Sequence, residues 1–174
     1  MRDFAAKWTA FPDWQSARIT RESRQARIVA GLSQVLVSGQ LEKAWKALPD
    51  SGEEVGLWQV TPPNRSYRVR MARDRALLVS PGPIDFIAGW HPEGWAATPA
   101  DDAYLVIDIQ GAAVEDMMME ATSANLGEGS PSASVRFAGL NGVLLFRCAE
   151  NCARLHVEAS YGPYIWQWLE TRKA

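Results

Sequence analysis

The chain has 174 residues, of which 47% are hydrophobic and 22% charged, and its formal net charge is −2 at pH 7. These values are typical of one soluble globular domain and give no electrostatic reason to expect nucleic acid or an anionic membrane as a partner. No apolar run reaches the roughly 20 residues that a membrane span needs, and the N-terminus has no apolar signal-peptide region. We therefore expect a cytoplasmic protein.

Residues 1–25 form an N-terminal tail that is set apart by its aromatic rings. Phe4, Trp8, Phe11 and Trp14 lie among charged residues, and Pro12 limits any helix there. A segment this short cannot bury its own rings, so they must dock on the domain or on another protein. The sequence leaves both outcomes open, and the four rings are candidate partner-interface residues.

The rest of the chain, 26–174, is predicted to be a single domain with two halves, about 26–92 and 96–174. In the first half the pattern predicts a strand or a broken pair over 26–38, a helix over 41–48, strands over 55–60, 67–71 and 76–80, and a helix that begins at Pro83 and ends near Trp90.

The second half is predicted to repeat this order. It has a strand over 104–110, a helix from Gly111 to about Leu126, a hairpin of strands over 134–138 and 143–148, a strand over 154–159 and a final helix. Helical spacing in that last helix places Ile165, Trp168, Leu169 and Arg172 inward and directs Trp166 away from them. Trp166 is therefore a further partner-interface candidate.

The two halves share the order β-α-β-β-β-α. Gly39 and Gly111 each end a strand and begin a helix, and Ala-Leu strands begin at Ala76 and Ala153. We therefore predict an α+β fold of two pseudo-repeated halves, with helices packed on antiparallel sheets.

No motif predicts catalysis or a metal centre. His91 and His156 are the only histidines, and His156 alternates with Arg154 and Glu158 on the polar side of its strand, which favours a solvated side chain. Cys148 and Cys152 flank a turn and could face each other across a hairpin, but in a reducing compartment we expect free thiols. Phosphate-binding and nucleophile motifs are absent. Five arginines gather in the first half and predict a solvated sheet edge or an anion or partner contact: Arg65, Arg68, Arg70, Arg73 and Arg75.

The most specific pattern lies in the second half. It comprises Thr98-Pro-Ala-Asp-Asp-Ala-Tyr-Leu-Val-Ile-Asp-Ile-Gln-Gly111, the hairpin sequence from Ser134 to Arg147, and the ending Ser160-Tyr-Gly-Pro-Tyr-Ile-Trp-Gln-Trp-Leu169. Pro63-Asn64 and Ala76-Leu-Leu-Val-Ser80 add to it. This arrangement resembles the γ subunit of heterotetrameric sarcosine oxidases, whose chains often end in Ser-Phe-x-x-Tyr-Leu-Trp-x-Trp-Leu. The likeness covers most of 26–169.

The resemblance implies a fold similar to the folate-binding domain of aminomethyltransferases. It also implies a non-catalytic assembly subunit that binds no cofactor itself, with FAD, FMN, NAD and tetrahydrofolate on partner subunits. Its partners would be those subunits, or further copies of the chain. The alternative is a stand-alone folate-binding or one-carbon-transfer protein of the same fold.

Overall fold

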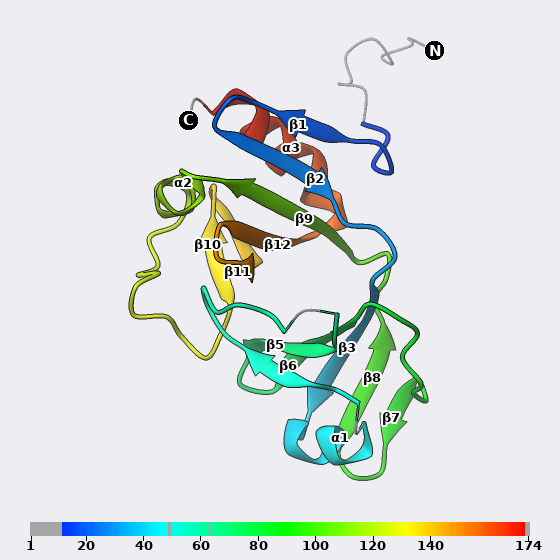
Figure 1. Cartoon of the computed structure of the whole chain (residues 1–174). Helices are drawn as coiled ribbons and strands as arrows, with labels where there is room; N and C mark the ends of the chain where they lie inside the picture. The colour runs from blue at the N-terminus through cyan, green and yellow to red at the C-terminus, as the bar shows by residue number, and fades with distance from the viewer. Residues whose placement is uncertain (1–11, 49, 63, 173–174) are drawn as a thin grey trace, which may run out of the picture.

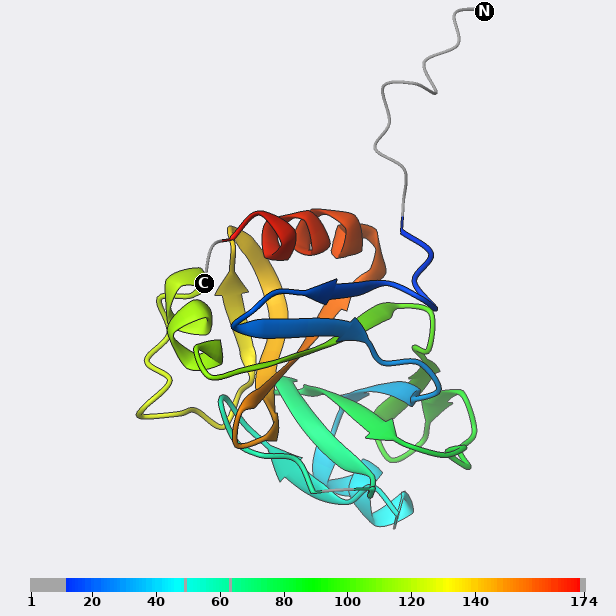
Figure 2. The ribbon, with the colours of Figure 1, turned by 45° about the horizontal axis from the view of Figure 1, so that its top comes forward.

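The computed structural model describes residues 12–48, 50–62 and 64–172. These residues form two six-stranded sheets, named A and B here, with helices on their outer sides (Figure 1). Helix α1 lies at the opposite end of the molecule from α2 and α3, so the layers run helices, sheet A, sheet B, helix (Figure 2). The mixed α+β class that the sequence predicts is confirmed.

Sheet B is built from one continuous stretch of chain. Its strands are β3 (Ser33–Gly39), β4 (Glu53–Val55), β5 (Tyr67–Ala72), β6 (Arg75–Ser80), β7 (Gly89–His91) and β8 (Trp95–Pro99), and their order is β4-β5-β6-β3-β8-β7. All neighbours are antiparallel except β4 and β5, which are parallel. The outer face of this sheet packs on α1 (Leu41–Ala47), which buries Leu41, Ala44 and Trp45.

Sheet A combines the two ends of the described chain. Its strands are β1 (Arg18–Thr20), β2 (Arg24–Ile28), β9 (Tyr104–Gly111), β10 (Ser134–Phe137), β11 (Leu140–Ala149) and β12 (Cys152–Glu158), in the order β1-β2-β9-β12-β11-β10. All neighbours are antiparallel. The outer face is covered by α2 (Val114–Ala121) and, after a 3-10 turn η2 (Ala159–Tyr161), by α3 (Gly162–Thr171).

The helices form because their apolar residues recur at helical spacing. In α2 the buried residues are Val114, Met117 and Met118, at steps of three and four. In α3 they are Gly162, Ile165, Trp166 and Leu169, at steps of three, four and seven. Both stripes pack on the aliphatic face of sheet A.

A separate apolar cluster fills the space between the inner faces of the sheets. Leu77 and Val79 of sheet B meet Leu144 and Phe146 of sheet A, and the Tyr67 and Phe146 rings pack edge to face at 5.7 Å. Each sheet is thus covered by helices on its outer face and by the other sheet on its inner face. This explains why its strands carry apolar residues on both faces.

The two sheets have matching strand orders and registers. Val37 of β3 lies between Ala76 of β6 and Ala97 of β8. In sheet A, Ile109 of β9 lies in the same way between Ala153 of β12 and Ala26 of β2. The hairpins β7–β8 and β1–β2 therefore occupy equivalent edges of the two sheets.

Two glycines occupy equivalent places in this arrangement. A Cβ on Gly39 would lie 2.4 Å from the Gly94 carbonyl oxygen, and one on Gly111 would lie 2.3 Å from that of Ser23. Gly39 has φ +98° and Gly111 φ +156°. Only glycine permits this close approach of the hairpin to the strand end.

The N-terminal hairpin is attached to the C-terminal helix by a buried arginine. Arg24 is 4% exposed, and its guanidinium donates to the carbonyl oxygen of Leu169 at 2.8 Å and to that of Arg172. Helix C-terminal carbonyls lack intrahelical partners and carry partial negative charge, so a buried cation is well placed there. This contact fixes the β1–β2 hairpin of sheet A to the C-terminal end of α3.

Four features predicted from the sequence are wrong. The tail predicted over 1–25 includes β1 and the start of β2. The predicted halves exchange two strands. Strand β2 lies in the predicted first half but pairs within sheet A, and β8 lies at the start of the predicted second half but pairs within sheet B. No helix begins at Pro83: Ile84 and Phe86 pack on the α1 core in an extended segment, and Gly89–His91 pairs with β8. Helix α2 also ends at Ala121, before Leu126.

None of the helices in the described residues is long and apolar enough to cross a membrane.

Candidate functional site

The inner face of sheet A carries a row of charged residues across three strands. Arg27 of β2 lies opposite Asp108 of β9, and Asp108 lies opposite Arg154 of β12. Phe146 of β11 continues the row. The corresponding row of sheet B holds uncharged side chains: Thr98, Leu36, Leu77 and Val69.

Arg154 and Asp108 form a buried, two-pronged ion pair. Arg154 Nε donates to Asp108 Oδ1 at 2.7 Å and Nη2 to Oδ2 at 2.9 Å, while the side chains are 13% and 2% exposed. Arg154 Nη1 also donates to the Tyr67 hydroxyl of sheet B at 3.1 Å. The pair is thereby fixed within sheet A and tied to sheet B.

The environment of this network keeps its groups in defined protonation states. Burial alone would lower the pKa of Arg154, but its hydrogen bonds to Asp108 and Tyr67 outweigh that effect and raise the pKa above its usual value. Burial also raises the pKa of Tyr67, with the charge of Arg154 opposing it. Arg154 is therefore a permanent cation and Tyr67 a neutral phenol at neutral pH.

A hollow of about 280 Å³ opens beside this network, between the sheets. Sheet A contributes Arg27, Asp108 and Arg154, and the loop before β5 contributes Asn64 and Arg65. Among these side chains, guanidinium groups outnumber carboxylates. We call this hollow the inter-sheet cleft.

His156 is buried between the sheets, so its prediction as a solvated strand residue is wrong. It is fully buried, and its Nδ1 lies 2.8 Å from Oε1 of Gln34 in β3. Gln34 Nε2 donates to the Tyr104 carbonyl at 3.2 Å, so Gln34 Oε1 accepts and the His156 proton sits on Nδ1. Burial lowers the pKa of His156 to about 3, with the charge of Arg154 adding to the effect.

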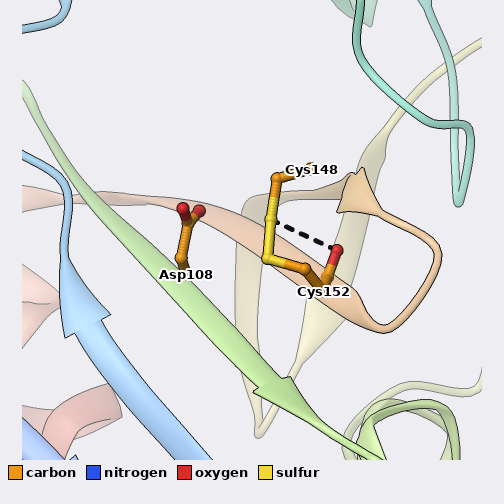
Figure 3. Close-up of side chains that lie close together, drawn as sticks. All are labelled: Asp108, Cys148 and Cys152. Atoms are coloured by element: carbon orange, nitrogen blue, oxygen red, sulfur yellow. Dashed lines mark hydrogen bonds between the residues drawn. A yellow bond between two sulfur atoms is a disulfide. The ribbon is translucent and has the colours of Figure 1, made fainter. Parts of the chain in front are cut away.

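Cys148 and Cys152 form a disulfide, contrary to the prediction of free thiols (Figure 3). The β11–β12 ladder pairs Ala149, the neighbour of Cys148, with Cys152. The Cα atoms of Cys148 and Cys152 are therefore only 5.4 Å apart. Cys148 also lines the inter-sheet cleft.

Asp108 lies next to the disulfide, and one ligand atom from each of the three residues falls within 4.8 Å of the others. Metal ions bind thiolates, however, and disulfide sulfurs carry no such charge. Both Asp108 oxygens already accept hydrogen bonds from Arg154. In this form the cluster therefore does not suit a cation.

The predicted interface rings have different outcomes. Phe4, Trp8 and Phe11 lie outside the described residues. Trp14 packs in cis, with its ring 6.0 Å from that of Trp166 in an edge-to-face contact. Trp166 is 3% exposed, so its prediction as an interface residue is wrong. Helix α3 buries the stripe that begins at Gly162, which places Trp166 inward.

The arginines of the first half do not act as one group. Arg70 forms a two-pronged ion pair with Glu54 at 2.8 and 2.7 Å. Arg68 stacks on the Trp45 ring, 5.0 Å from its centre. Only Arg65 of the five lines the inter-sheet cleft.

Two exposed apolar side chains that the sequence does not predict lie at the outer edge of sheet B. Ile87 is 78% exposed and Trp90, on edge strand β7, is 72% exposed. A hollow of about 690 Å³ adjoins Ile87. Its lining includes Lys43, Lys46 and His91, and the His91 ring stacks on the Trp95 ring with 3.6 Å between their centres. We call Ile87 and Trp90 the β7 patch.

Comparison with solved structures gives an informative likeness. No protein-family model matches the chain, and neither does any curated protein sequence. Among solved structures, a chain of "Heterotetrameric Sarcosine Oxidase from Corynebacterium sp. U-96 in complex with pyrrole 2-carboxylate" superposes with a TM-score of 0.67 at 17% identity. The match covers 90% of this chain and 91% of that chain. The chain has the fold of a sarcosine oxidase subunit. The resemblance that its sequence indicates is thus confirmed for the fold.

The buried ion pair gives a stability prediction. Asp108→Asn should lower the free energy of unfolding by about 3–5 kcal/mol, because it leaves the Arg154 charge buried without a counter-charge. The matched control is Glu120→Gln, which breaks the exposed Arg172–Glu120 pair and should cost about 1 kcal/mol or less. Urea unfolding measures both, and equal losses would contradict the assignment.

His156 gives a pH prediction. Because its pKa is about 3 in the folded chain and near 6.5 when unfolded, only the unfolded state binds its proton between these values. Stability should therefore fall as pH drops from about 6.5, with a His156 contribution of up to about 1.4 kcal/mol per pH unit. His156→Gln should remove that contribution, whereas His91→Gln should keep it. Unfolding curves from pH 6.5 to 4.5 test this, and identical slopes in the wild type and His156→Gln would refute it.

The disulfide gives a chemical prediction. Protein unfolded without reductant should take up no thiol label, and after reduction it should take up one label per cysteine. Because the cysteines are four positions apart, the closed loop is short and reduction should cost about 2 kcal/mol or less. Labelling of both cysteines without reductant would show that free thiols are the resting state.

Proposed function

We propose that the chain is a non-catalytic assembly subunit of a sarcosine oxidase-like flavoenzyme complex. The observation that carries the proposal is the likeness to a heterotetrameric sarcosine oxidase chain over 90% of this chain and 91% of that one. Near-complete coverage in both directions supports a subunit of similar extent, here of the γ type.

The arrangement of the buried ionisable groups supports a non-catalytic role. Asp108 and Arg154 satisfy each other, and His156 bonds to Gln34. Such groups stabilise sheet packing, whereas a general acid or base needs contact with a substrate and a pKa near the working pH. We propose that FAD, FMN, NAD and tetrahydrofolate are bound by the partner subunits, and that the assembly resides in the cytoplasm.

The surface most suited to a partner is the β7 patch. Large exposed apolar side chains, tryptophan in particular, are typical interface anchors. Strand β7 also lies at the edge of sheet B. The tail rings Phe4, Trp8 and Phe11 remain candidates beside it, and self-association is the alternative partner.

We also propose that the two halves arose by duplication of one unit. The two sheets have the same strand order, which supports this proposal. The row of paired residues Ala97, Val37 and Ala76 in sheet B also corresponds to the row Ala26, Ile109 and Ala153 in sheet A. The copies have since diverged, because β4 pairs in parallel and β10 antiparallel, and α3 has no counterpart after β6.

Affinity purification from the native cell tests the function. A C-terminally tagged chain should recover flavoprotein partners with a visible flavin spectrum that bleaches when a secondary amine is added. The double variant Ile87→Ser/Trp90→Ala should recover much less flavin, because it removes the β7 patch. Tyr161→Ala, a change at an exposed ring elsewhere, should behave as the wild type.

Further arms separate the alternatives. Deletion of residues 1–11 shows whether the tail takes part in assembly. A colourless dimer of the chain alone would favour self-association, and saturable tryptophan quenching by a folate would favour the stand-alone folate protein. Either result, or a colourless monomer, would show the assembly role to be wrong.

A further inference from the structure

The inter-sheet cleft concentrates positive charge. Arg27 and Arg154 approach from strands of sheet A, and Arg65 approaches from the loop before β5. Asp108 is the acidic residue in the lining. The hollow of about 280 Å³ is therefore lined by three arginines and one carboxylate.

These charges are not fully compensated by the protein. Asp108 is committed to Arg154 through two short hydrogen bonds, whereas Arg27 reaches it only at 3.5 Å and is 56% exposed. Within the described ranges, Arg65 takes part in none of the ion pairs. Among the described residues, the Arg65 guanidinium has no ion-pair partner and the Arg27 guanidinium has only one long contact, so both can turn to an anion in the cleft.

Neutral donors lie beside the free cations. Tyr67 is 3% exposed, and its hydroxyl oxygen accepts a hydrogen bond from Arg154, which leaves its own proton to donate. The amide side chains of Asn64 and Gln110 also line the hollow. Guanidinium and hydroxyl donors around one small space match the acceptor oxygens of a carboxylate or phosphate.

We propose that the inter-sheet cleft binds a small organic or inorganic anion through Arg27 and Arg65. The hollow lies just below the range of about 300–1,000 Å³ that holds drug-sized ligands, so it suits a small acid or a phosphate group and not a dinucleotide. Arg154 is a positioning residue, because it holds Tyr67 and Asp108 in place while its own charge is paired. The proposal is independent of the assembly role.

Isothermal titration of the full-length chain tests the site, with inorganic phosphate and succinate titrated separately at constant ionic strength. At least one of them should bind at a single saturable site. Arg27→Gln and Arg65→Gln should each weaken binding about tenfold or more, because each loses a charge-assisted hydrogen bond. The matched control is Arg136→Gln, on the exposed face of β10 at the far edge of sheet A, which should bind as the wild type does.

The two titrations also identify the source of the anion. Saturation by phosphate alone indicates a phosphate ligand, and saturation by succinate alone indicates a carboxylic acid. The proposal is overturned if neither anion saturates, if both cleft variants bind as the wild type does, or if Arg136→Gln weakens binding equally. Unchanged melting temperatures for the three exposed-arginine variants would show that any loss of binding is local.

Discussion

The face-to-face packing of the two sheets is the constraint on which the rest of the structure depends. It buries Asp108 and His156 and leaves Arg154 only 13% exposed, so each of these side chains needs a fixed partner. Two of the contacts cross between the sheets, Arg154 with Tyr67 and His156 with Gln34. A one-residue slip of β12 would turn its charged residues towards the helices, so these contacts specify register as well as stability.

The path of the chain adds a second constraint. Sheet B is one continuous stretch, but sheet A needs the N-terminal hairpin to meet strands more than 70 residues later, as the pairing of Gln25 with Gln110 shows. Arg24 then joins that hairpin to the end of α3. The chain therefore folds as one unit with helices on both outer faces. The β7 patch, which we propose as the partner surface, lies at the edge of sheet B, and the proposed anion site is the inter-sheet cleft.

Much of this fold can be predicted from periodicity, and the misses have physical reasons. Strands β5, β6, β9, β11 and β12 and the buried faces of α1 and α2 follow from their apolar spacing, whereas β1, β7 and β8 were not predicted and β4 lies at 53–55 instead of 55–60. His156 was misplaced because alternation shows that a strand face is polar but not that a second sheet covers it. Trp166 was misplaced because the buried stripe of α3 begins at Gly162. The segment after Pro83 has helix-like signals, yet Ile84 and Phe86 bury at a two-residue spacing and Gly89 has φ +109°. The cleft combines residues from both halves, so no local motif reveals it.

Hydrogen–deuterium exchange of the chain, alone and in its recovered assembly, tests the central claim most directly. That claim is that a rigid two-sheet scaffold presents an outer edge to a flavoprotein partner. The account predicts slow exchange in β9 and β12 in both states, with new protection on assembly confined to residues 84–95 and 1–11. Protection centred on the inter-sheet cleft, or no change anywhere in the presence of the partner, would contradict it.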